Sequence, residues 1–188
     1  MFGFNISKPS SNAVRSPTGT TTGRLWHTAR VADEHNDAAT VRFPPPLVYL
    51  AAVILGALLH AYVLPFRYEF GLGARITAGT AIALLGTAVM GGAIGLFRRT
   101  GQDPKPWKTT PEIISTGVYR FTRNPMYVGM ALIQTAIGVG FANGWILALL
   151  PPVLVIIYAT AIRQEEAYLE SKFGDGYTAY KKSVRRWL

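Results

Sequence analysis

A short polar stretch, residues 115–127, carries the side chains best suited to chemistry. It reads STGVYRFTRNPMY and lies between two long apolar runs. Its Asn-Pro step is typical of a point where a loop becomes a helix, because proline keeps the preceding residue extended and suits the first helical turn. Arg120 and Arg123 add positive charge beside Tyr119 and Tyr127. Such a set can hold a charged, ring-bearing small molecule at the mouth of a membrane protein.

A second candidate group is the pair of adjacent carboxylates at Glu165 and Glu166, which follows the last apolar run. On a helix the two glutamates lie on either side of an apolar stripe. Acidic side chains at a membrane edge are costly unless they meet a partner. Candidate partners are Arg120, Arg123 and a cationic ligand. The alternative is an ordinary helix end held by local contacts, including those of Arg163.

Several other kinds of chemistry are excluded by composition. The chain has no cysteine, which excludes disulfides, thiolate metal sites and cysteine nucleophiles. Its three histidines, His27, His35 and His60, show no metal-ligand spacing, so we expect no metal site. The net charge is +9, but the basic residues flank hydrophobic runs. We therefore expect anionic membrane lipids, and not nucleic acid, as the counter-charge.

The apolar residues are concentrated in four runs, which predict an all-α, polytopic membrane helix bundle of about four transmembrane helices. The predicted spans are residues 47–64, 74–97, 125–141 and 145–162. The very short turn after the third run requires a tight antiparallel hairpin. Pro151 and Pro152 predict a kink in the fourth span, because proline cannot donate the helical hydrogen bond. A charged helical segment, residues 163–173, continues the fourth span.

The positive charges predict the orientation. All Lys and Arg except Arg67 and Arg75 lie before the first span, in residues 98–124 or in residues 163–188. By the positive-inside rule, both termini and these two segments face the cytoplasm. We expect an integral protein of a bacterial inner membrane, and the sequence leaves the oligomeric state open.

The chain divides by composition into two regions. Residues 1–42 are dominated by small polar residues and predict a disordered tail, and residues 43–188 form the membrane domain. The start of the tail is basic and free of acids, a bias shared with organelle transit peptides. The alternative is an untargeted cytosolic extension.

Two blocks carry a resemblance to known proteins. The stretch TGVYRFTRNPMYVG, followed after two apolar runs by RQEEAYLESKFGDGYTAYKKSV, resembles the membrane methyltransferases of the isoprenylcysteine carboxyl methyltransferase and phospholipid N-methyltransferase family. The resemblance covers residues 113–184. The usual first motif of that family is Arg-His-Pro-x-Tyr, and here Asn124 stands in place of the histidine. Asparagine can form hydrogen bonds but cannot carry a charge.

The resemblance implies that S-adenosylmethionine binds between the loop before the third span and the charged end of the fourth. Glu166 is then either a support for this site or a base for an amine acceptor, and Arg163 is a candidate for handling the substrate. Methyl transfer mainly requires positioning. The cofactor-binding residues that the resemblance implies are Ile114, Tyr119, Asn124, Pro125, Met126, Tyr127 and Glu165.

The resemblance leaves the methyl acceptor open. A prenylated cysteine carboxylate, a phospholipid amine and a small hydrophobic thiol or acid all remain possible lipophilic acceptors. Two other functions are also compatible with the sequence. One is a nicotinamide-dependent membrane reductase of the sterol reductase type, and the other is a non-catalytic membrane protein that binds lipids or a partner.

Overall fold

The computed structural model describes residues 44–101 and 112–187, and all of them belong to one compact unit, Asp37–Leu188. This part of the chain is helical and contains no strand. The predicted all-α fold is therefore confirmed for the described residues. The predicted polar tail, residues 1–42, and residues 102–111 of the middle loop lie outside them.

The described helices follow the predicted runs closely. In chain order they are α2 (Pro45–Leu58), which continues as a π-helical turn (Leu59–Val63), α3 (Leu72–Arg99), a 3-10 turn (Gly117–Arg120), α4 (Pro125–Gly140), α5 (Gly144–Ala148), α6 (Leu150–Ile157), a π-helical turn (Tyr158–Ile162), α7 (Arg163–Phe173) and α8 (Asp175–Ser183).

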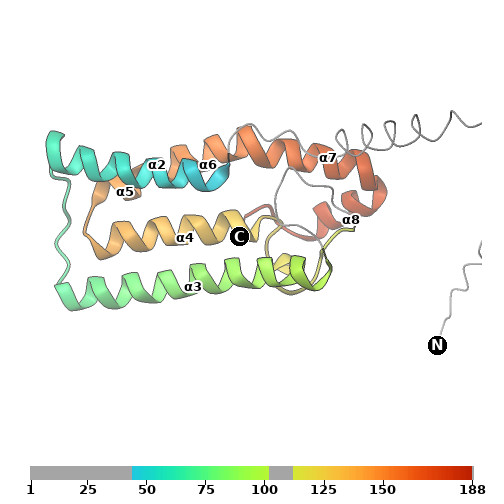
Figure 1. The fold of residues 1–188 in the computed structure, drawn as a ribbon, viewed down its shortest axis with the longest axis horizontal. Helices are drawn as coiled ribbons and strands as arrows, with labels where there is room; N and C mark the ends of the chain where they lie inside the picture. The colour runs from blue at the N-terminus through green and yellow to red at the C-terminus, as the bar shows by residue number, and fades with distance from the viewer. Residues whose placement is uncertain (1–43, 102–111, 188) are drawn as a thin grey trace, which may run out of the picture. The chain divides into compact units, whose positions relative to one another are not determined.

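Helix α4 lies inside the bundle, with α3 on one side and α2, α5 and α6 on the other (Figure 1). Helices α3 and α4 approach closely where Gly86 faces Gly129. A Cβ atom on Gly86 would lie 2.9 Å from the carbonyl oxygen of Gly129, and a Cβ atom on Gly129 would lie 2.9 Å from that of Gly86. Small residues thus permit this helix pair to form in lipid.

Three helices are long and apolar enough to cross a membrane: Pro45–Val63, Leu72–Arg99 and Gly144–Phe173, with 19, 28 and 30 residues. Helix α4 is apolar but shorter. Its 16 residues extend over about 24 Å, against ~30 Å of hydrocarbon. The protein is therefore an integral membrane helix bundle with three long apolar helices and one shorter apolar helix.

The two predicted irregularities near the last span are present. The tight turn after α4 contains Ala142 at φ 49°, and the Asn143 side chain then accepts from the backbone N–H groups of Trp145 and Ile146 to begin α5. The helix is interrupted at Leu149, and the two prolines occupy the first turn of α6. Proline suits that position because a first-turn N–H has no helical acceptor.

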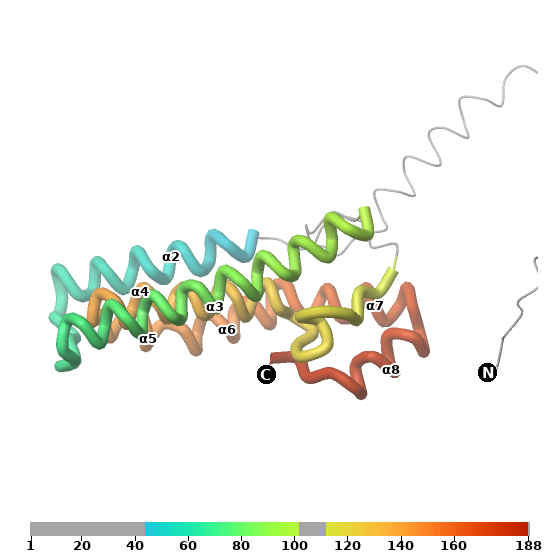
Figure 2. The backbone as a smooth tube through the Cα atoms, turned by 90° about the horizontal axis from the view of Figure 1, so that it is seen from below, coloured from blue at the N-terminus to red at the C-terminus, as the bar shows by residue number. Residues whose placement is uncertain are grey.

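The C-terminal part of the chain folds back on the bundle. Gly174, at φ 52°, ends α7, and α8 returns beside it (Figure 2). Beyond α8 the backbone is extended at Val184. Trp187 then packs against a buried cluster that includes Tyr49, Tyr127 and Ile162. Residues 184–187, called here the C-terminal strap, thus reach the start of α4.

Candidate active site

The first turn of α4 meets the first turn of α7 at one end of the bundle. The Tyr127 hydroxyl donates a hydrogen bond of 2.5 Å to Glu165 Oε1. The backbone carbonyl of Tyr127 accepts a 3.1 Å hydrogen bond from the Tyr49 hydroxyl of α2. Two residues from the two separate sequence blocks are therefore in direct contact, and a third helix fixes the backbone at this point.

Tyr119 joins this pair from the 3-10 turn. It is 7% exposed, its ring lies edge-on to Phe97, and its carbonyl accepts a 2.8 Å hydrogen bond from the Tyr180 hydroxyl. Burial raises the pKa of Tyr119, and the charge of the nearby Glu165 raises it further. Glu165 thus acts electrostatically on the Tyr119 phenol and is in hydrogen-bond contact with the Tyr127 phenol.

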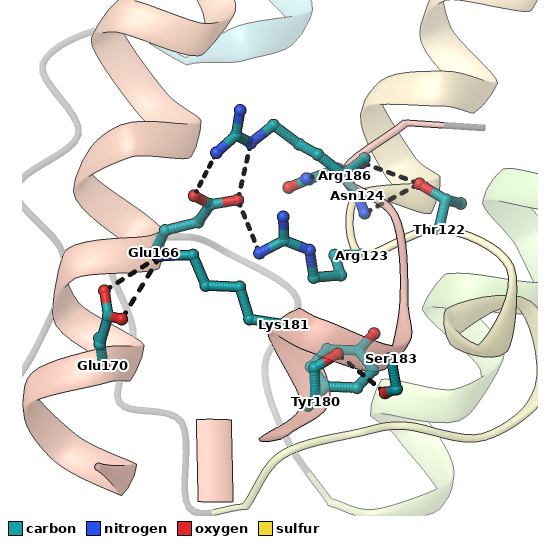
Figure 3. Close-up of polar contacts among 9 residues, drawn as sticks. All are labelled: Thr122, Arg123, Asn124, Glu166, Glu170, Tyr180, Lys181, Ser183 and Arg186. Atoms are coloured by element: carbon teal, nitrogen blue, oxygen red, sulfur yellow. Dashed lines mark hydrogen bonds and ion pairs between the residues drawn. The ribbon is translucent and has the colours of Figure 1, made fainter. Parts of the chain in front are cut away.

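The loop that enters α4 is attached to the C-terminal strap (Figure 3). The Asn124 side chain donates from Nδ2 to the carbonyl oxygen of Arg186 at 3.0 Å, and the Thr122 hydroxyl donates to the same oxygen at 3.0 Å. The backbone N–H of Arg123 donates to the carbonyl of Arg185 at 3.0 Å. Asn124 therefore has a defined structural partner that requires no charge.

Glu166 lies between two arginines (Figure 3). Arg186 donates from Nε and Nη2 to its two carboxylate oxygens, both at 2.9 Å, and Arg123 Nη1 lies 3.1 Å from Oε1 as an ion pair. The hydrogen bond to Glu166 raises the pKa of Arg186, whose guanidinium also lies 4.9 Å from the centre of the Tyr158 ring. Glu166 is only 8% exposed, so this is a largely buried charge cluster.

Glu165 has the opposite environment. Among the described residues it forms no ion pair with a basic side chain, and its partner is the neutral Tyr127 hydroxyl. A partly buried carboxylate beside a second carboxylate is unfavourable without a cation. The site can therefore accept a cationic ligand at Glu165, with two phenol rings next to it.

Comparison with known proteins shows the family of the chain. The phospholipid methyltransferase family matches residues 74–176, more than half of the chain. The chain belongs to this family.

Two individual proteins are similar to parts of the chain. An uncharacterised protein of Haemophilus influenzae is 42% identical over 65 residues, which are 34% of this chain and 100% of that protein. The protein-S-isoprenylcysteine O-methyltransferase of Schizosaccharomyces pombe is 35% identical over 72 residues, 38% of this chain. That match spans only 30% of the yeast enzyme. No solved structure matches the chain.

The other residues to which the family resemblance assigned a role lie at different depths. Pro125 is buried, while Met126 and Ile114 are half-buried, and all three lie on the same stretch of chain that leads into α4. Arg163 is exposed at the start of α7 and forms no ion pair with a described residue. The role of Arg163 in handling the substrate stays a prediction.

The two arginines predicted as partners of Glu165 and Glu166 differ in their contacts. Arg123 does pair with Glu166, as the sequence allowed. Arg120 instead is exposed and lies 5.9 Å from the centre of the Phe121 ring. Because both oxygens of Glu166 accept from guanidinium groups, the arrangement favours a supporting role over that of a base.

Arg186 and the strap that carries it were not predicted from the sequence. One signal was available, since two adjacent acids at the edge of a membrane family domain require more than one basic partner. The sequence RRW near the chain end offers two cations and a large apolar anchor. Nothing in the local pattern, however, indicates which of these arginines reaches α7.

Proposed function

We propose that this protein transfers a methyl group from S-adenosylmethionine to a lipophilic acceptor. The observation that carries the proposal is the difference between two neighbouring carboxylates. Among the described residues, Glu166 has two arginine partners, whereas the hydrogen-bond partner of Glu165 is the Tyr127 hydroxyl. A ligand with a positive charge would complete the site, and membership in the phospholipid methyltransferase family points to the methyl donor.

The residues around Glu165 fit such a donor. S-adenosylmethionine carries a sulfonium and an ammonium group, and Glu165 can pair with either charge. Tyr119 and Tyr127 add aromatic rings, which attract cations at their faces. These groups come from three separate elements that other contacts already fix, so binding would require little reordering of the protein.

When bound, the cofactor supplies an activated methyl group. The task of the chain is then to hold the donor and acceptor in line and to exclude water. Tyr127 keeps the Glu165 carboxylate in one position, and the bond from Asn124 to the strap keeps the loop before α4 in place. We infer that Asn124, Pro125, Met126 and Ile114 line the cofactor pocket.

The contacts of Glu166 with two arginines indicate which type of methyl acceptor the site suits. An amine acceptor must lose a proton before it attacks, whereas a carboxylate arrives ionised. Because Glu166 is bound by two guanidinium groups, we infer that it positions the site and that the acceptor needs no base from this residue. A prenylcysteine-like carboxylate meets this condition, and a phospholipid amine is the alternative.

We also infer how the site sits in the membrane. The described parts of the basic segments, residues 98–101, 112–124 and 163–187, lie at the same end of the bundle as Tyr127 and Glu165 (Figure 1), so we infer from the positive-inside rule that the site is on the cytoplasmic side. Helix α4 then acts as a fourth, short span shielded by its neighbours, with both termini in the cytoplasm. A bacterial inner membrane is the expected location.

Calorimetric titration of the detergent-purified protein tests the cofactor assignment. We expect S-adenosylmethionine to bind and NADPH not to bind. The variant Glu165→Gln should weaken S-adenosylmethionine binding at least about tenfold, because a desolvated charge pair is worth 2 kcal/mol or more. Glu170→Gln is the matched control, since Glu170 lies on the same helix, pairs with Lys181 and is exposed.

Two results would overturn the proposal. One is binding of NADPH, which would favour the reductase alternative, and the other is S-adenosylmethionine binding that Glu165→Gln leaves unchanged. Incubation of a lipid extract with methyl-labelled cofactor, followed by separation into lipid classes, then identifies the acceptor. Label in a base-stable amine headgroup would reject the carboxylate acceptor.

A further inference from the structure

Two apolar grooves meet at Arg75, at the end of the bundle opposite the candidate active site. One has a volume of about 620 Å³ and the other about 430 Å³, and Arg75 lines both. The first runs along Ile76, Thr80 and Ala83, and the second along Ala74, Ala78 and Ile82.

The grooves flank the seam between α3 and α4. Gly79 lies on that seam, one turn along α3 from Arg75, and a Cβ atom there would be 3.2 Å from the carbonyl oxygen of Ala136. Residues spaced three to four apart share a helix face, so each groove extends from Arg75 toward the middle of the bilayer along one side of α3. Helix α4 contributes Ile133 and Ile137 to one groove and Val139 to the other.

Arg75 carries a charge without a counter-ion in the described part of the chain. It forms no ion pair with a described carboxylate, and its Nε is buried without a hydrogen-bond acceptor. The other basic residue at this end, Arg67, donates to His60. A cation at a membrane interface is stabilised by an anionic headgroup, and apolar grooves beside it suit hydrocarbon chains.

We propose that Arg75 and the two grooves bind one anionic phospholipid, with its phosphate at the guanidinium and one acyl chain in each groove. This site is separate from the methyl-transfer site. Arg75 precedes Phe97, the α3 residue that contacts Tyr119, by 22 residues, or about 33 Å along the helix. The bound lipid therefore belongs to the leaflet away from the proposed cofactor site and is not the acceptor.

Native mass spectrometry of the full chain in detergent tests the charge part of the proposal. Phosphatidylglycerol and phosphatidylcholine of the same chain length are titrated separately. We expect one phosphatidylglycerol to be retained at least about fivefold more tightly than phosphatidylcholine. Arg75→Gln should remove this preference, Arg75→Lys should keep part of it, and the matched control Arg67→Gln should keep all of it.

The grooves are tested with the arginine left in place. Thr80→Phe and Ala78→Phe each put a ring into one groove, and either should lower phosphatidylglycerol retention severalfold, because one acyl chain loses its position. These two variants also test the proposed lipid site if Arg75→Gln fails to fold. Equal retention of both lipids by the unchanged protein, or retention unaffected by the arginine and groove variants, overturns the proposal.

S-adenosylmethionine titration of the same variants separates the two proposals. Because the lipid site lies far from Glu165, we expect cofactor affinity to stay within about twofold of that of the unchanged protein. Loss of lipid preference with intact cofactor binding supports the lipid site independently. If the unchanged protein binds lipid selectively but no cofactor, the proposed function fails and the lipid site stands.

Discussion

At the scale of single residues, the site depends on how the backbone separates two neighbouring acids. Consecutive helical residues differ by about 100° in direction, so Glu165 and Glu166 reach different partners. Glu166 accepts hydrogen bonds from Arg186 and forms an ion pair with Arg123, and Glu165 accepts from Tyr127. Glu166 is paired with cations of the protein, whereas Glu165 has no cationic partner among the described residues, so a cationic ligand can pair with it.

Substitution of each acid by glutamine should therefore have opposite effects on stability. Glu166→Gln leaves the side chain of Arg123, which is 7% exposed, without its counter-ion, and should cost on the order of 3 kcal/mol. Glu165→Gln removes a repulsive charge, and glutamine can still accept from Tyr127, so stability without cofactor should be unchanged or higher. Thermal unfolding in detergent, with and without S-adenosylmethionine, measures both effects.

Thermal unfolding with added S-adenosylmethionine then compares how well the variants bind the cofactor. The unchanged protein and Glu170→Gln should unfold at a higher temperature when S-adenosylmethionine is added, because a ligand that binds only the folded state stabilises it. Glu165→Gln should lose this increase. Equal loss of stability in the two glutamine variants would show that the environments of the two acids do not differ as described.

Asn124 allows a second residue-scale prediction. Its Nδ2 donates to the Arg186 carbonyl, so Asn124→Ala removes a partly buried hydrogen bond and should cost about 1 kcal/mol. Asn124→Asp places a carboxylate oxygen against that carbonyl and should cost more than alanine does. Unfolding measurements of the two variants give the order, and an aspartate variant as stable as the unchanged protein would contradict this contact.

At the scale of elements, the sequence predicted the helices that carry the site but not what joins them. The third span was predicted as residues 125–141 and the charged extension as residues 163–173, and α4 and α7 follow these bounds nearly residue for residue. Each has a strong local signal, an Asn-Pro step at the start of α4 and a glycine directly after α7. Local patterns therefore sufficed for α4 and α7.

The sequence did not predict the π-helical turns or the C-terminal strap. The turn at Tyr158–Ile162 changes the angular position of every residue that follows, including both glutamates, and π-helical turns are set by tertiary packing rather than by propensity. The strap binds a loop more than 60 residues earlier in the chain. Pairing over such a distance leaves no periodic signal in a single sequence.

The C-terminal strap is expected to affect cofactor binding through Arg186. Arg186 acts as a positioning residue, because it touches Glu166 and the loop before α4. Arg186→Ala should weaken S-adenosylmethionine binding about tenfold and raise the KM for the cofactor more than that for the acceptor. Arg186→Lys keeps a charge but not the two-point contact, so it should restore only part of the affinity.

The matched control for the strap is Lys182→Ala. Lys182 is exposed on α8, so Lys182→Ala should leave the KM values for cofactor and acceptor unchanged. A purely structural role for Arg186 would instead lower the fraction of folded protein and leave the KM of the remaining enzyme as it was. Such a result would remove the strap from the proposed site.

At the scale of the whole bundle, the α3 and α4 seam connects the two ends of the described membrane domain. The same helix pair carries the grooves around Arg75 at one end and leads into the Tyr119 and Tyr127 cluster at the other. The seam is closest where Gly86 faces Gly129. Any side chain added there must separate the helices, because the obstructing atoms include the backbone carbonyl oxygens of both glycines and the Cβ atoms of Leu132 and Met90.

The glycines of α3 and α4 thus include two groups that alanine substitution should distinguish. Gly86→Ala and Gly129→Ala introduce Cβ atoms 2.9 Å from backbone carbonyl oxygens and should each destabilise the protein by about 1–3 kcal/mol. Gly91→Ala and Gly95→Ala meet no atom within 4 Å and should be neutral or stabilising by up to about 1 kcal/mol, since alanine favours helix. Unfolding in detergent measures all four, and a seam variant as stable as Gly91→Ala would mean that α3 and α4 are not held at this distance.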